Sequence, residues 1–169
     1  MRTLKYVWTL VGWLVMSWLA GCTPEYNWRE VMVAADHAMI AFPARVQTEQ
    51  RALQFEGLNL IFSLASAYVG PSVFAVGSAP LPVGISPDQT EALVRGLVQS
   101  LAVGGAEPAP GAFKGEPFEL AATVSGQPSW MLARVLVHRG MLMQVVVTGP
   151  TQALSHEHAT EFMRSLALK

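Results

Sequence analysis

Short segments in which apolar and polar residues alternate dominate the chain, and this two-residue period is typical of β-strands. In the first half the pattern predicts strands over residues 38–43, 47–55, 58–69 and 73–79, after a short first element over 28–34. In the second half it predicts strands over 118–124, 130–138 and 141–148. Segment 47–55 is polar on both faces, which suits a strand at the edge of a sheet.

The last two of these strands form a hairpin in this prediction. Arg139 and Gly140 separate them, which is the spacing of a two-residue hairpin loop. This loop places three pairs of residues opposite each other on one face: His138 with Met141, Leu136 with Met143, and Arg134 with Val145. Most residues on both faces of the hairpin are apolar, so we expect it at a central position in the sheet with both faces covered.

Two segments have the apolar spacing of an amphipathic helix. The first begins at Ser86-Pro87-Asp88-Gln89, where a capping hydroxyl, a proline and an early acid meet the requirements of a helix start. Its apolar stripe consists of Leu93, Val94, Leu97, Val98 and Leu101, and Gly104-Gly105 is its expected end. The second begins near Ser155, and its stripe consists of Ala159, Phe162, Met163 and Leu166.

The order of four strands, a helix, three strands and a helix predicts an α+β fold. We expect a mainly antiparallel sheet of about seven strands with two packing helices. Residues 28–169 are long enough for a single domain with its own core. Residues 106–115, which hold two prolines and two glycines, are the predicted mobile loop of this domain.

The first 21 residues have the build of an export signal. Arg2 and Lys5 precede an apolar run over residues 7–20, which is shorter than the about 20 residues that a membrane-spanning helix needs. Leu19-Ala20-Gly21-Cys22 at its end resembles the lipobox of bacterial lipoproteins. The resemblance implies that a signal peptide over 1–21 is cleaved between Gly21 and Cys22, and that Cys22 receives the lipid anchor. Residues 22–27 are then a short tether; an ordinary cleaved signal and a retained helix are the alternatives.

Charge and cysteine content argue against a nucleic-acid partner and against an internal disulfide. Cleavage after residue 21 leaves 148 residues and removes two of the eleven basic side chains, so nine remain against twelve acidic ones and the net charge is −3. The chain therefore lacks the basic stripe that a nucleic-acid partner requires. Cys22 is the only cysteine, so no disulfide forms within the chain. In the lipoprotein family a residue other than aspartate after the cysteine, here Thr23, favours the outer membrane on its periplasmic side.

The layout also resembles the PsbP-like (Mog-like) α/β fold, and within it the small bacterial lipoproteins of the DcrB kind. The corresponding features are Trp28, the strand end Phe42-Pro43, the helix from Ser86, the hairpin 130–148 and the segment 162–166. The resemblance implies a sandwich of sheet and helices and a binding or assembly role without catalysis. It supplies no functional residues.

His156, Glu157, His158 and Glu161 have the chemistry of metal ligands at the start of the second helix. Side chains two positions apart on a helix point about 200° apart, so His156 and His158 cannot chelate one ion together. We interpret these residues as a solvated helix start.

His138, Met141 and Met143 share one face of the predicted hairpin, and an imidazole with thioethers suits copper(I). Methionines in a β-rich core more often fill gaps, and we favour that interpretation. The prediction is therefore no metal site and no cofactor.

Arg134 is the lone charge in an apolar strand. An inward-pointing guanidinium needs a partner, and we expect Glu116 or Glu119 from the preceding segment. Asp36-His37 is interpreted as part of a turn, because adjacent residues of a strand face opposite ways and could not act as a catalytic pair.

Motifs of nucleophilic catalysis and phosphate binding are absent from the sequence, so we predict no catalytic residues and no enzyme. We expect a lipid-anchored periplasmic module that binds or assembles with an envelope protein, and residues 106–115 contribute to its partner surface. The alternative is a carrier of a small molecule or metal in a pocket between helix and sheet.

Overall fold

Antiparallel strands make up most of the computed structural model, which describes residues 25–102 and 107–169. Six of them form one sheet in the order β3-β4-β5-β8-β7-β6, and three form a smaller sheet in the order β1-β2-β9. The strands of the larger sheet are β3 (Gln47–Phe55), β4 (Leu58–Val69), β5 (Ser72–Pro80), β6 (Phe118–Val124), β7 (Gln127–His138) and β8 (Met141–Pro150). Those of the smaller sheet are β1 (Arg29–Val33), β2 (Ala38–Phe42) and β9 (Ala167–Leu168).

The α+β class and the antiparallel sheet are confirmed, but the described residues contain nine strands instead of about seven. The two additional strands are β1, which the sequence left as an unassigned first element, and β9. β9 has only two residues, too few for a pattern of alternation to be recognised. Segment 47–55 is an edge strand, as predicted, because β3 pairs with β4 alone.

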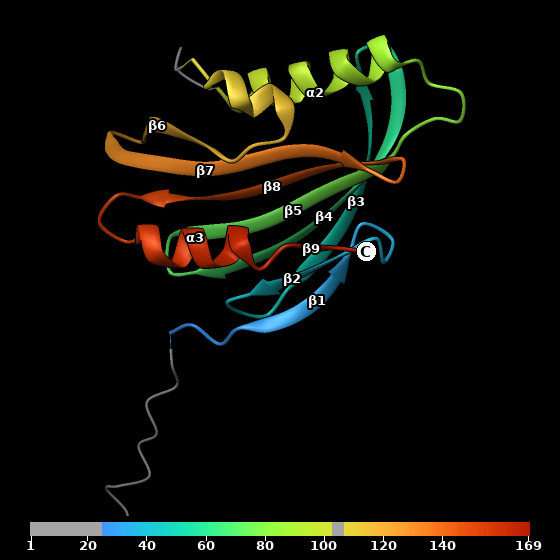
Figure 1. Cartoon of the computed structure of the whole chain (residues 1–169). Helices are drawn as coiled ribbons and strands as arrows, with labels where there is room; N and C mark the ends of the chain where they lie inside the picture. The colour runs from blue at the N-terminus through green and yellow to red at the C-terminus, as the bar shows by residue number, and fades with distance from the viewer. Residues whose placement is uncertain (1–24, 103–106) are drawn as a thin grey trace, which may run out of the picture.

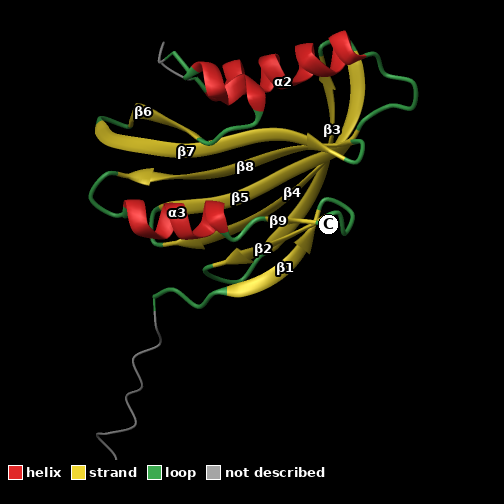
Figure 2. Ribbon diagram, in the orientation of Figure 1, coloured by secondary structure: helices red, strands yellow, loops and turns green. Residues whose placement is uncertain are grey.

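Each face of the larger sheet is covered by a different layer (Figure 1). Helix α2 (Pro87–Leu101) and the short 3₁₀ helix η2 (Pro110–Lys114) lie over one face. Helix α3 (His156–Arg164) and the smaller sheet lie over the other. Figure 2 shows the two helices on opposite sides of the strands, which gives three layers.

The hairpin of β7 and β8 has the predicted register. His138 pairs with Met141, Leu136 with Met143, and Arg134 with Val145. The hairpin occupies a central position, since β8 pairs with β5 and β7 with β6. Its side chains enter the cores on both faces: Met143 and Val145 on the α3 side, and Val135 and Leu142 on the α2 side.

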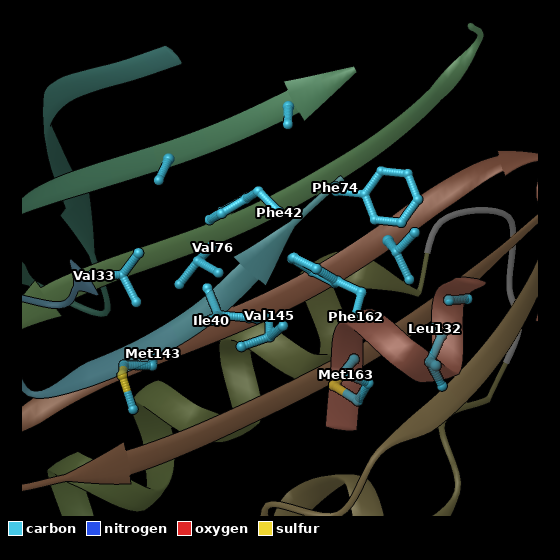
Figure 3. Packing of buried hydrophobic residues seen from close by; sticks show 14 of the residues in the cluster. Val33, Ile40, Phe42, Phe74, Val76, Leu132, Met143, Val145, Phe162 and Met163 are labelled. Carbon is cyan, nitrogen blue, oxygen red and sulfur yellow. The ribbon is translucent and has the colours of Figure 1, made fainter. Parts of the chain in front are cut away.

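Three phenylalanines hold the α3 side together (Figure 3). Phe42 comes from β2, Phe74 from β5 and Phe162 from α3, and all three are fully buried. The ring of Phe162 lies 5.3 Å from each of the other two ring centroids. Full burial of a phenylalanine contributes roughly 1.5–3 kcal/mol each, so this contact fastens the smaller sheet and α3 to the larger sheet.

The helix starts are those that the sequence predicts. Ser86 caps α2 in a reciprocal pair with Gln89, and Pro87 is its first residue. Ser155 caps α3 by accepting a hydrogen bond from the His158 amide. The buried residues of α2 are Leu93, Leu97 and Val98, and those of α3 are Ala159, Phe162 and Met163. The predicted end of the first helix, Gly104-Gly105, lies outside the described residues.

The prediction of a mobile loop over 106–115 is wrong for its second half. Residues 110–114 form η2, in which Pro110 occupies the first turn and Gly115 ends the helix with a positive φ of 82°. Ala112 is fully buried and Phe113 packs against the core on the α2 side. Pro110 and Gly115 therefore bound a compact turn against the sheet. Ala106 lies outside the described residues.

Asp36-His37 lies in the turn between β1 and β2, as predicted. The turn is unusual because Ala34, Ala35 and Asp36 all have a positive φ, between 50° and 68°, without any glycine. Left-handed backbone costs roughly 1–2 kcal/mol per residue. The carbonyl of His37 accepts a hydrogen bond of 2.9 Å from the Lys169 amide, which helps to hold the turn.

Within the described ranges, no helix combines the length and the apolar character that crossing a bilayer requires. The predicted signal peptide over 1–21 and Cys22 lie outside these ranges.

The hydroxyl of Ser72 is buried without a hydrogen-bond partner among the described residues. We expect Ser72→Ala to raise the free energy of unfolding by about 1 kcal/mol, because an unsatisfied buried hydroxyl is removed. Urea denaturation measures the change. Ser129→Ala is the matched control: Ser129 is also buried, at 6% exposed, but its hydroxyl donates to the Gln127 carbonyl at 3.3 Å, so its loss should not stabilise the fold. Equal destabilisation by both variants would contradict the prediction.

Candidate functional site

An enclosed apolar cavity lies between α2 and the larger sheet, and we name it the α2 cavity. It has a volume of about 260 Å³. Its lining comes from three strands and one helix: Leu53 and Phe55 of β3, Leu60 and Phe62 of β4, Leu142 and Gln144 of β8, and Leu97 and Ser100 of α2.

The strand pairing explains why these side chains converge. Leu53 and Leu60 are directly opposite each other in the pairing of β3 with β4. Residues two apart on a strand share a face, so Phe55 and Phe62 point to the same side as these leucines. This side is the α2 side, because Leu60 belongs to the core beneath α2.

Two glycines set the positions of the aromatic rings. Gly77 of β5 lies under the ring of Phe62, and a Cβ at this position would overlap that ring. Gly96 of α2 faces Phe55, whose Cζ atom is 2.8 Å from the place that a Cβ would occupy. A glycine inside a helix or strand reduces stability by roughly 0.5–1 kcal/mol, and here it permits close packing on either side of the cavity.

Exposure of the lining residues falls from the mouth of the cavity to its floor. Leu53 is 46% exposed and Ser100 is also exposed, so these two residues form the mouth. Leu60 is 4% exposed and Leu142 is fully buried, so they form the floor. A ligand could therefore enter between the edge strand β3 and the C-terminal half of α2.

Gln144 is the polar residue on the wall of the cavity that belongs to the sheet. It is half-buried and lies between Gly77 of β5 and Val135 of β7 in the strand pairing. No side-chain hydrogen bond among the described residues involves its amide. An amide offers both donors and an acceptor, so Gln144 can bind a polar group that enters an otherwise apolar space.

This arrangement has the chemistry of a small apolar binding site. Ligand sites are mostly apolar with a few placed polar groups, and an engineered cavity of about 150 Å³ in another protein already binds benzene. No charged residue lines the α2 cavity. Unfilled space of this size reduces the stability of a core by on the order of a few kcal/mol, so a ligand that fills it would stabilise the domain.

A second, more open hollow lies where α2, η2 and β7 meet. Its volume is about 510 Å³, and its lining includes Ile85, Glu91, Phe113, Lys114 and Val137. We expected residues 106–115 on a partner surface, and three of them, Phe113, Lys114 and Gly115, line one side of this hollow. The hollow offers apolar and charged groups side by side, as protein-binding surfaces do.

The histidines at the start of α3 pack against separate aromatic rings. His156 stacks on Trp130 with the ring centroids 4.0 Å apart, and His158 stacks on Tyr26 at 3.7 Å. The described residues contain no group of three His, Cys, Asp or Glu side chains that could hold a metal ion. Burial, and to a smaller extent the carboxylate of Glu25, raise the pKa of the Tyr26 phenol above its ordinary value, so this ring stays neutral.

The three residues considered for copper(I) share the predicted face but differ in burial. Met143 is fully buried in the core on the α3 side, and Met141 is 7% exposed. The Nε2 atom of His138 is 2.8 Å from the Lys169 carbonyl, which places the ring at the C-terminal segment. This packing agrees with the interpretation of both methionines as core residues.

The predicted partner of Arg134 is wrong. The Nε atom of this half-buried residue donates a hydrogen bond of 2.7 Å to the carbonyl of Gly115, and neither Glu116 nor Glu119 forms an ion pair with it among the described residues. Glu119 instead lies 3.7 Å from His156. Arg134 therefore ties the end of η2 to β7, a backbone contact that side-chain charges in the sequence could not reveal.

Sequence reasoning also missed the lining of the α2 cavity. One signal was present in the sequence. Gln144 is the polar residue within 141–147, a segment that is otherwise apolar and that is buried on both faces of the sheet. Cys22, the predicted lipid-bearing residue, lies outside the described residues. Comparison of the chain with models of protein families finds no match, and neither does a search of curated proteins.

We expect Arg134→Leu to lower the free energy of unfolding by about 1–2 kcal/mol, because the charged hydrogen bond to Gly115 is lost and η2 is released from β7. Thermal and urea unfolding measure the effect. Arg45→Leu is the control, since Arg45 is exposed and such a change should stay within about 0.5 kcal/mol. An effect of Arg134→Leu no larger than that of the control would show that the hydrogen bond does not stabilise the fold.

Proposed function

We propose that this protein is a lipoprotein anchored by Cys22 in the outer membrane of a bacterium, facing the periplasm, and that its domain is a binding or assembly module without enzymatic activity. The export signal, the lipobox Leu19-Ala20-Gly21-Cys22 and the resemblance to lipoproteins of the DcrB kind support the proposal. An envelope protein is the proposed partner.

The way in which the chain enters the domain is the observation that most supports a role at the membrane. The Asn27 amide donates a hydrogen bond of 2.6 Å to the Pro43 carbonyl. Tyr26 stacks on His158 and meets Phe74 edge to face. The fold therefore includes Tyr26, only four positions after Cys22, and a chain of this length spans at most about 14 Å. A lipid on Cys22 would hold the domain next to the bilayer.

The second candidate function is that of a carrier for a small molecule, and the α2 cavity favours it. The cavity is enclosed by a helix and three strands and has an exposed mouth at Leu53 and Ser100. A metal cargo lacks comparable support in the ranges that the structure describes. A carrier and a protein-binding module do not exclude each other, because the hollow beside η2 and the α2 cavity have different linings.

Replacement of the proposed lipid-bearing residue tests the anchor. We expect Cys22→Ser to abolish incorporation of radiolabelled palmitate and to move the protein from the detergent phase to the aqueous phase in a phase-partition experiment. Two or three acyl chains bind a bilayer far more strongly than one, so the shift should be nearly complete. Thr23→Ser keeps the cysteine and is the control. Undiminished labelling of the Cys22→Ser protein would refute the anchor.

Crosslinking in intact cells tests the proposed partner. A photoreactive residue at exposed Glu91, beside the hollow of α2, η2 and β7, should capture one envelope protein in preference to others. The control position is Gln54 of the edge strand β3, which is exposed but does not line that hollow. The same faint set of products from both positions would count against a protein partner at this surface.

A further inference from the structure

We propose that the α2 cavity binds the alkyl chain of an uncharged amphiphile, and that the amide of Gln144 binds its polar group. The inference rests on the carrier role proposed above and names the chemical class of the cargo. It follows from the volume of the cavity, the polarity of its lining, and the position of its mouth.

The lining selects an alkyl group. Six of the eight residues around the cavity are leucine or phenylalanine, namely Leu53, Phe55, Leu60, Phe62, Leu97 and Leu142. Transfer of each methylene from water to such surroundings is favourable, and the gain increases with chain length until the space is full. At about 260 Å³ the cavity exceeds the space that holds a benzene ring, which suits a chain of medium length.

The polar groups select an uncharged ligand. Ser100 donates its hydroxyl hydrogen to the Leu97 carbonyl at 2.7 Å, so it is already satisfied within the helix. The Gln144 amide takes part in none of the side-chain hydrogen bonds among the described residues, and it can both donate to a carbonyl and accept from a hydroxyl. A carboxylate or ammonium group would enter a cavity whose lining has no opposite charge, and such a transfer is strongly unfavourable.

The charged residues Glu49 and Arg51 of β3 pair with each other, and the carboxylate of Glu56, one residue after Phe55, lies beside Gly96 of α2. Arg51 is two residues from Leu53 on the same side of the strand, and its Nη2 atom lies 3.0 Å from the Glu49 carboxylate. This exposed pair compensates its own charge outside the mouth. The geometry thus favours an alcohol, amide or ester over a fatty acid.

Photoaffinity labelling tests the inference on the full chain in phosphatidylcholine nanodiscs. The probe is 1-decanol with an alkyl diazirine, and insertion sites are mapped by mass spectrometry. We expect insertion within 53–62, 97–100 and 142–144, and competition by unlabelled 1-decanol. Labelling spread evenly over the exposed surface, or labelling that 1-decanol does not reduce, would overturn the inference.

Two matched variants on one strand separate the cavity from general adsorption. Leu60→Phe fills the floor and should reduce labelling at these segments by about tenfold or more, which corresponds to about 1.4 kcal/mol of binding free energy. Ile61→Phe is the neighbouring change on the opposite face, where Ile61 is 60% exposed, and it should leave labelling unchanged. If Leu60→Phe fails to fold by circular dichroism, Leu53→Trp at the exposed mouth replaces it. Equal labelling of the filled and control variants would overturn the inference.

The role of Gln144 is tested with probes that differ only in the head group. Gln144→Leu should weaken labelling by the decanol probe about fivefold, the effect of one hydrogen bond, and leave a decane probe unchanged. Decanoate and decylammonium probes should label weakly. Stronger saturable labelling by a charged probe would refute the uncharged class while the carrier role stands. Failure of every probe to give saturable labelling would refute the carrier role itself.

Discussion

Burial of apolar side chains on both faces of the central strands is the constraint on which this structure depends. β5, β7 and β8 have alternate residues in two separate cores, and neither core can be exposed without a large loss of stability. The chain meets this requirement with two coverings of different kinds. On one side α3 and a small sheet close tightly around Phe42, Phe74 and Phe162. On the other side α2 and η2 must cover most of a six-stranded sheet.

The covering by α2 and η2 is the less complete one, and the α2 cavity arises from this. Phe55 of edge strand β3 and Phe118 of edge strand β6 both belong to the core beneath α2, so the twisted sheet curves around a single helix (Figure 1). α2 packs closely on β7 and, through Gly96, on Phe55. The space between these two contacts is filled only in part by Leu97 and Phe62. The α2 cavity thus results from the geometry of one helix that packs across a broad sheet.

Local patterns in the sequence were sufficient for the features that depend on near neighbours. The register of the β7–β8 hairpin follows from a two-residue loop, and the start of α2 follows from Ser86, Pro87 and Gln89. Features that depend on distant partners were not accessible. The contact of Arg134 is with the backbone carbonyl of Gly115, and β9 is recognisable only through its pairing with Ala38 and Met39. The α2 cavity depends on how far a helix lies from three strands, for which a single sequence has no direct signal.

The pairing of β9 with β2 has a consequence for the order in which the elements of the domain fold. Ala38 and Met39 bond to Leu168 and Ala167, and the Ala41 amide donates to the Ser165 hydroxyl at 3.0 Å. The first and last segments of the domain therefore complete one sheet together. As the chain is synthesised from its N-terminus, β2 lacks these partners until residues 165–168 have been made. Closure of so long a loop is slow relative to the formation of local hairpins, so the smaller sheet is completed late, after the hairpins of the larger sheet can already form.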